Sequence, residues 1–139
     1  MDTTDAPQIY EHITQQLSFT AYDTRWLPHS SKAVICGQTP RMKGVVKFVA
    51  LGDSSLEERH SAEFGTGFKA ASFNYYFGDA TPGLALADTS GELYLFDLEA
   101  QKVRWEAKAH ARMANCLDSV GGKLGRGAVE VVSGGSDGK

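Results

Sequence analysis

The chain has 139 residues, of which 42% are hydrophobic, and its formal net charge is −3. This length allows one domain with a hydrophobic core, and the composition is that of a globular protein without a disorder signature. A slightly acidic balance argues against binding to nucleic acid or to an anionic membrane, because those partners require a basic surface.

The expected compartment is the cytoplasm. Residues 1–15 are polar and acidic and lack the regions of a signal peptide. No apolar run approaches the roughly 18 residues that span a bilayer. Cys36 and Cys116 have apolar neighbours and unrelated spacing, which favours two reduced, partly buried thiols.

Short apolar or alternating runs, separated by Gly, Pro, Asp and Ser, dominate the chain. Strands of this length and spacing indicate an all-β sandwich, barrel or propeller. The charged segment 56–63 is ambiguous. In chain order we expect strands at 19–27, 33–37, 44–51, 68–74, 84–87, 92–98, 102–106, 115–120 and 129–133.

Two stretches have the pattern of one repeated unit, the first at 84–110 and the second beginning at residue 129. When Gly91 is aligned with Gly138, each unit has an apolar strand and then a tight turn that ends in glycine. The spacing of the two glycines is about one β-propeller blade with a loop insertion.

The two units resemble WD repeats. The segment SGGSDGK at 133–139 is similar to their strand–turn–strand. Phe96 and Asp97 stand where these repeats carry Trp-Asp, and His110 stands where they carry the His of Gly-His. The resemblance implies a partial WD-repeat β-propeller of about two and a half blades of four-stranded antiparallel sheet.

The order of the motifs is similar to that of one family, named WD repeat-containing protein 92 or Monad, whose members are axonemal dynein assembly factors. The most specific pieces are PQIYEHI at 7–13 and DSVGGKLGRGAVEVVSGGSDG at 118–138. The resemblance implies that residues 1–139 are the N-terminal part of one propeller domain. Its blades would span about 14–63, about 66–108 and, incompletely, about 110–139, and residues 8–13 would form the strand that closes the ring.

Residues 98–117 favour a helix by propensity alone, because Ala, Glu, Lys, Arg and Leu dominate them. They lack an apolar stripe with helical spacing. Pairing with neighbouring strands often overrides propensity. In a propeller we therefore expect strands at 102–106 and 113–119, with Val103 and Trp105 on one face of the first.

Three residues match the hydrogen-bonded series that the WD-repeat resemblance implies: His110, Ser133 and Asp137 form the expected structural blade network. The carboxylate of Asp137 would accept from the imidazole and fix its tautomer. The preceding unit departs from the pattern, since Ser90 stands where Asp is expected and Asp88 where Ser or Thr is expected.

Most aromatic side chains are expected to pack in the core or between blades, among them Trp26 and Tyr22. The cluster Tyr75, Tyr76 and Phe77, between a strand and a loop, is the candidate protein-binding surface.

No catalytic residue, cofactor or metal site is expected. Residues 134–138 match the G-x-S-x-G of a hydrolase nucleophile elbow, but that motif needs a following helix and a later acid and His. The glycine-rich segment 121–127 is not a phosphate loop, because it precedes a strand. The histidines and cysteines lack metal-ligand spacing.

The resemblance implies a non-catalytic scaffold or adaptor for protein–protein interaction in axonemal dynein assembly. The implied partners are dynein chains and a chaperone complex with RuvB-like ATPases and prefoldin-like subunits. An association with apoptosis is also attached to the family name. The alternative function is substrate recognition for a ubiquitin ligase. A partial propeller would expose unpaired strand edges, so self-association is also expected.

Overall fold

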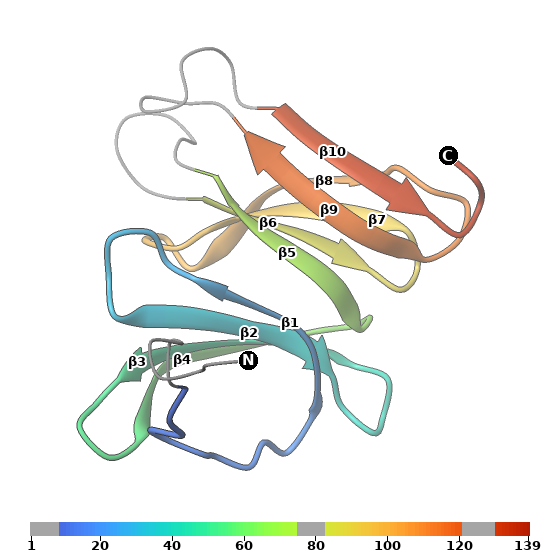
Figure 1. The fold of residues 1–139 in the computed structure, drawn as a ribbon. Helices are drawn as coiled ribbons and strands as arrows, with labels where there is room; N and C mark the ends of the chain where they lie inside the picture. The colour runs from blue at the N-terminus through green and yellow to red at the C-terminus, as the bar shows by residue number, and fades with distance from the viewer. Residues whose placement is uncertain (1–8, 75–82, 121–129) are drawn as a thin grey trace, which may run out of the picture.

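The computed structural model describes residues 9–74, 83–120 and 130–139, and these residues form ten β-strands and no helix (Figure 1). The strands form three antiparallel sheets, ordered β1-β2-β3-β4, β5-β6-β7-β8 and β10-β9. The prediction of an all-β partial propeller is therefore confirmed. The bounds are β1 (Thr20–Trp26), β2 (Lys32–Gln38), β3 (Gly44–Leu51), β4 (Leu56–Phe64), β5 (Phe68–Asn74), β6 (Gly83–Asp88), β7 (Glu92–Asp97), β8 (Lys102–Lys108), β9 (Ala114–Val120) and β10 (Glu130–Gly135).

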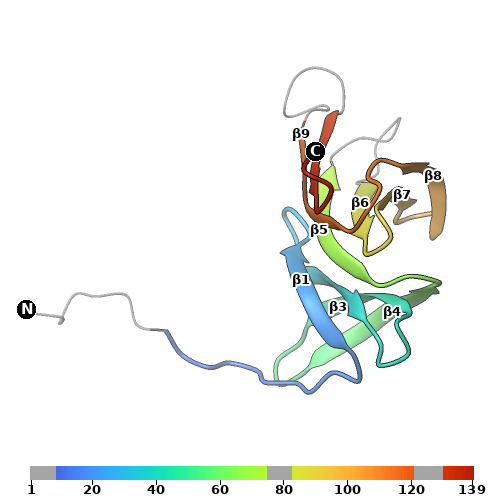
Figure 2. The same cartoon turned by 90° about the vertical axis from the view of Figure 1, so that its right-hand side faces the viewer.

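The sheets stack against one another through their first strands. β1 contacts β5, and β5 contacts β9. Figure 2 shows these three strands on one side of the molecule, with β4 and β8 on the other. Consecutive strands pair within each sheet, so each sheet is a local meander and the non-local contacts lie between sheets. The blade boundaries given above stay a prediction.

β6 is buried along its whole length because sheets pack on both of its faces. Leu84 and Leu86 point into the cluster shared with the first sheet, where they meet Val34. Ala85 and Ala87 point into the cluster shared with β9. A strand covered on both sides has no solvent face, and this explains the continuous apolar sequence LALA.

Two segments that were ambiguous in sequence are strands. The charged segment is β4, at one edge of the first sheet, where half-buried and exposed residues alternate from His60 to Phe64. Residues 98–117 contain β8 and the start of β9, and they include no helical residue. Pairing of β8 with β7, and of β9 with β10, overrides the helical propensity.

The two turns aligned in the repeat have the same backbone form. Gly91 and Gly138 have φ values of 95° and 80°, in the left-handed region that glycine enters without steric cost. The Gly91 N–H donates to the Asp88 carbonyl oxygen at 3.2 Å, and the Gly138 N–H donates to that of Gly135 at 3.3 Å.

Some packing expectations are wrong. Trp26 is 59% exposed and Tyr22 is 44% exposed, although the Tyr22 ring lies under Lys69 Nζ at 4.1 Å. Both residues are on β1, an edge strand whose side chains are mostly exposed. Cys116 is also exposed, because β9 is covered on one face only, whereas Cys36 is buried.

Residues 9–13, which belong to the expected closing strand at 8–13, form no strand, because none of the ten strands pairs with them. Within the described ranges, no helix has the length and apolar character needed to cross a membrane.

Candidate functional site

His110 lies in the loop between β8 and β9, and its backbone ties this loop to the second sheet. The N–H groups of Ala109 and His110 both donate to the Gly91 carbonyl oxygen, at 3.1 and 3.0 Å. A Cβ atom at Gly91 would lie 2.4 Å from the His110 carbonyl oxygen. Glycine at this turn is therefore needed both for its φ value and for the close approach of the loop.

The imidazole of His110 is bonded through both of its nitrogen atoms. Nδ1 lies 3.0 Å from Asp137 Oδ1, and Nε2 lies 2.9 Å from Ser133 Oγ. A carboxylate can only accept, so Nδ1 donates to Asp137, and in the neutral ring Nε2 accepts from the Ser133 hydroxyl. The structure thus brings together the three residues of the expected network. His110, at its centre, is only 5% exposed.

Asp137 also holds the backbone around it. Its Oδ2 accepts from the Ala111 N–H at 2.9 Å, and its Oδ1 accepts from the Lys139 N–H at 3.3 Å. The pKa of Asp137 is lowered to about 2. The hydrogen bond from the Ala111 N–H is the largest cause, and the hydrogen bond from His110 lowers the pKa further. The carboxylate is therefore ionised at neutral pH and joins the His110 loop to the turn after β10.

Gly135 has no side chain and therefore leaves room for the imidazole ring of His110. A Cβ atom there would lie 2.4 Å from His110 Nδ1. The next residue, Ser136, donates its N–H to the Met113 carbonyl oxygen at 2.8 Å. Its hydroxyl accepts from Asn115 Nδ2 at 2.9 Å. His110 therefore bonds Ser133 of β10 and not Ser136, the serine of the G-x-S-x-G segment.

The turn of the second sheet uses a different acidic residue, which the sequence analysis did not identify as functional. Asp88 is fully buried, and its Oδ1 accepts from the N–H groups of Ser90, Gly91 and Glu92, each at 2.8–2.9 Å. The signal was present in the sequence Asp-Thr-Ser-Gly at 88–91, a pattern of turns in which the carboxylate caps its own backbone.

Polar contacts also join the first strands of the sheets. Asp23 Oδ2, at a bulge in β1, accepts from the Ala71 N–H of β5 at 2.9 Å. Ser72 donates to Asp118 Oδ1 of β9 at 2.9 Å. This hydrogen bond, with that from the Ser119 N–H, lowers the pKa of Asp118. These contacts fix the relative position of neighbouring sheets.

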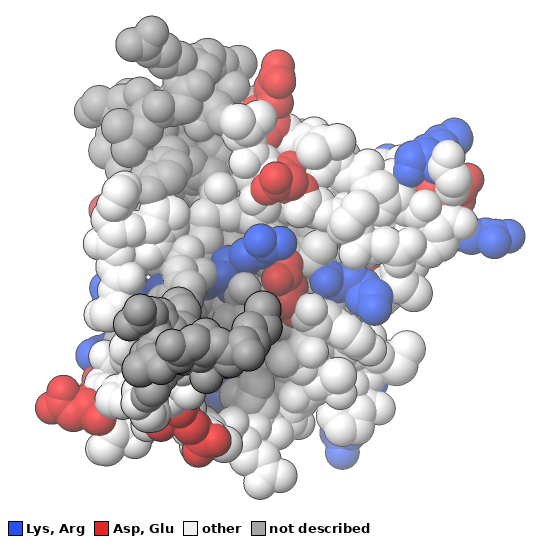
Figure 3. Space-filling view, in the orientation of Figure 1, with Lys and Arg blue, Asp and Glu red and all other residues white. Residues whose placement is uncertain are grey.

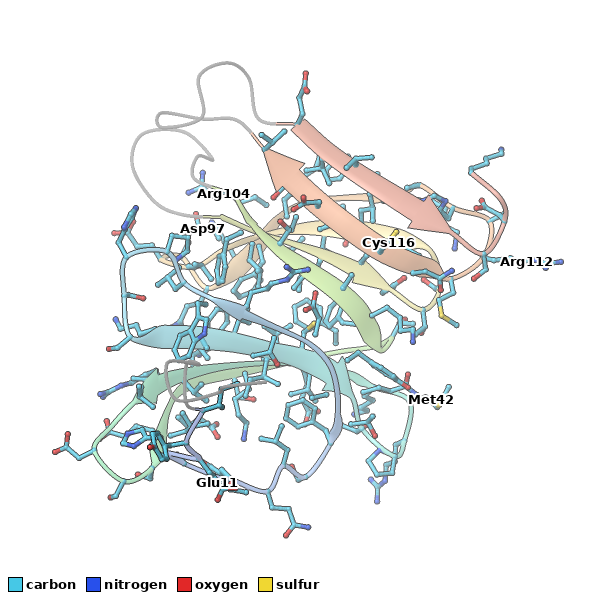
Figure 4. All side chains as sticks on the ribbon, viewed as in Figure 1. Glu11, Met42, Asp97, Arg104, Arg112 and Cys116 are labelled. Atoms are coloured by element: carbon cyan, nitrogen blue, oxygen red, sulfur yellow. The ribbon has the colours of Figure 1, made fainter. Side chains whose placement is uncertain are left out.

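Asp97, expected in the place of the Asp of Trp-Asp, is 3% exposed and ends β7. It accepts from the N–H groups of Glu99 and Ala100 and forms an ion pair with Arg104 of β8 (Figure 4). The hydrogen bond from the Ala100 N–H is the largest cause of the lowered pKa of Asp97, and the hydrogen bond from Arg104 is the next contact that lowers it. Asp97 thus stabilises the β7–β8 turn.

The candidate surface at Tyr75, Tyr76 and Phe77 lies outside the described residues, as does the glycine-rich segment 121–127. On the face seen in Figure 3, acidic and basic side chains are interspersed and form no large patch of one sign. Among the described residues no group of three or more His, Cys, Asp or Glu side chains is placed to hold a metal ion.

Comparison with known proteins identifies relatives along nearly the whole chain. The chain is 36% identical over 146 residues to Dynein axonemal assembly factor 10 of Bos taurus, and 37% identical over 147 residues to that of Chlamydomonas reinhardtii. The Homo sapiens protein of the same name is 33% identical over 146 residues. Each match covers 99% of this chain and 39% of the relative, so the chain spans well under half of the length of these proteins. No known family profile matches.

The family name expected from the sequence is corrected by these matches. The relatives carry the name Dynein axonemal assembly factor 10, a protein also known as WDR92, in place of the expected name WD repeat-containing protein 92 or Monad. The correction concerns the name, since the relatives' name also refers to axonemal dynein assembly.

Solved structures share the fold at low sequence identity. A chain in the crystal structure of an active polycomb repressive complex 2 in the basal state superposes with a TM-score of 0.55 at 14% identity. The superposition covers 72% of this chain and 22% of that one. A chain in the structure of ctPRC2 in complex with H3K27me3 and H3K27M gives a TM-score of 0.52, also at 14% identity. This likeness concerns the fold alone.

Proposed function

We propose that this chain is part of a non-catalytic scaffold that acts in the cytoplasmic assembly of axonemal dynein. The observation that carries the proposal is the similarity, along 99% of the chain, to proteins named Dynein axonemal assembly factor 10. The partners proposed are dynein chains and a chaperone complex that contains RuvB-like ATPases and prefoldin-like subunits.

The geometry of the network supports a structural role for its polar residues. Both nitrogen atoms of His110 are engaged, and Asp137 bonds two backbone N–H groups as well as the ring. A partly buried network whose members are all hydrogen-bonded rigidifies a structure, whereas a general base needs access to a substrate proton. Rigid sheets joined in this way suit a protein that presents fixed surfaces to partners.

Affinity purification from ciliated cells tests the proposal. A tagged chain is expected to recover dynein heavy chains together with RuvB-like proteins. Recovery of cullin adaptors instead would favour a substrate-recognition module of a ubiquitin ligase. Ester hydrolysis that is lost in the Ser136→Ala variant would contradict the absence of catalysis.

A further inference from the structure

A small pocket opens between the first and second sheets, apart from the His110 network. It is lined by residues of β2, β3 and β4 and by the β7–β8 turn, and its volume is about 240 Å³. In Figure 1 the β1–β2 connection and the β7–β8 turn, which both contribute residues to the lining, lie on the same side of the molecule. The pocket thus lies where two sheets meet and belongs to neither alone.

The floor of the pocket is apolar and held in place by the core. Phe48 lies opposite His60 in the β3–β4 register and stacks on Phe96 of the second sheet, with ring centroids 6.2 Å apart. Leu98 packs against the same core cluster, and Leu27 adds a further apolar side chain. Such a floor suits a bulky apolar side chain that enters from solvent.

The polar lining of the pocket consists of basic side chains and the neutral side chain of Gln101. Lys32, Arg59 and His60 line the pocket, and no Asp or Glu of the described residues does so. Arg59 is 58% exposed and shares its charge with Glu57, at 2.6 Å. No described carboxylate forms an ion pair with Lys32 or His60. Lys32 is thus a lining cation with no carboxylate partner among the described residues, in a chain of net charge −3, whereas Arg59 is already paired with Glu57.

We infer that this pocket binds a segment of a partner protein in which an acidic side chain lies beside a bulky apolar one. The apolar side chain would rest on Phe48 and Leu98, and the carboxylate would accept hydrogen bonds from Lys32 and Arg59. The volume is below the roughly 300–1,000 Å³ of pockets for drug-sized ligands, so one or two side chains of a peptide fit better than a cofactor. The inference deepens the proposed scaffold role and rests on it.

Fluorescence anisotropy with a labelled peptide, GDELFEDG, tests the inference on the purified chain. Saturable binding that weakens with added salt is expected, because screening reduces the attraction between the peptide and the rim. The peptides GKKLFKKG and GDEGGEDG, which lack the acidic residues and the apolar residues respectively, should bind at least about tenfold more weakly. Equal binding of all three peptides, or no binding of the first, would overturn the inference.

A matched pair of variants locates the site. Lys32→Gln combined with Arg59→Gln is expected to weaken peptide binding about tenfold. Arg41→Gln combined with Lys139→Gln removes the same number of charges at exposed positions away from the pocket and should leave binding unchanged. Thermal unfolding of both variants checks that they fold, and Arg59→Lys should retain most of the binding.

The outcomes separate this inference from the proposed function. Peptide binding that depends on Lys32 and Arg59 supports the pocket even if dynein chains fail to co-purify, which would count against the proposed function alone. If the wild type and the Lys32/Arg59 variant recover the same amount of dynein and the peptide does not bind, the inference about the pocket alone is overturned. A change of oligomeric state in that variant, without peptide binding, would assign the pocket to a second copy of the chain and would also overturn the inference.

Discussion

The Nδ1 atom of His110 lies 3.0 Å from Oδ1 of Asp137, although 27 positions separate the two residues in the chain. The contact joins the loop after the second sheet to the turn after β10. Ser133 bonds the opposite nitrogen of the ring, so one side chain links three segments.

Replacing His110 by Ala should lower the free energy of unfolding by about 1–3 kcal/mol, because the hydrogen-bonding groups of Ser133 and Asp137 lose their buried partner. Urea unfolding followed by circular dichroism measures the change. His12→Ala, at an exposed position, is the control and should change it by less than about 0.5 kcal/mol. Equal effects of the two variants would contradict the network.

The stability that Asp137 contributes should depend on pH. Its pKa is about 2 in the folded chain and about 3.9 when unfolded. The contribution is therefore complete above the unfolded pKa and is lost as the pH falls from about 4 to about 2. Unfolding midpoints measured at about pH 6 and about pH 3 should differ less for Asp137→Asn than for the wild type, since an amide does not titrate. The same loss in both proteins would show that Asp137 is not the titrating group.

Gly135→Ala should destabilise the chain by about 1–3 kcal/mol, because the added methyl group would overlap the His110 ring. Gly65→Ala is a suitable comparison, since a Cβ atom there has no heavy atom of the described residues within 4 Å. It should change stability by about 0.5 kcal/mol or less. Thermal unfolding of the two variants side by side tests the close approach.

The two thiols should react differently with iodoacetamide. Burial, and then the charge of Asp23, raises the pKa of Cys36 to about 12, so little reactive thiolate forms at neutral pH. Cys116 is exposed on β9 and should be alkylated first, as measured by mass spectrometry. The Cys116→Ser variant should stay unmodified until it is unfolded. Labelling of Cys36 in the native chain would contradict its burial.

The purified chain should associate with copies of itself. β10 pairs only with β9 in the described residues, and Val132 is 69% exposed on it. Such an edge is a template for strand pairing, and Val132→Lys should reduce association. Ser136→Lys, in the exposed turn, is the charge control. Light scattering after size exclusion measures the mass, and a well-behaved wild-type monomer of 15.0 kDa would contradict the prediction.

Local patterns were sufficient to locate most strands. Alternation or apolar runs bounded by turn residues predicted nine of the ten strands, and only β4 was ambiguous because its charges mask the alternation. The alignment of Gly91 with Gly138 predicted two matching turns, and both glycines have a positive φ, which glycine adopts without steric cost.

The sequence by itself determined the all-β class, the strand order and, through its resemblance to WD repeats, the grouping of His110, Ser133 and Asp137. Only the tertiary structure decided that Ser72 bonds Asp118 across two sheets and that Trp26 is exposed. The physical reason is that strand formation follows from a period of two along the chain, which is local. Which face of a strand is covered, and which polar groups meet, depends on how the sheets stack, and no short stretch of sequence encodes that stacking.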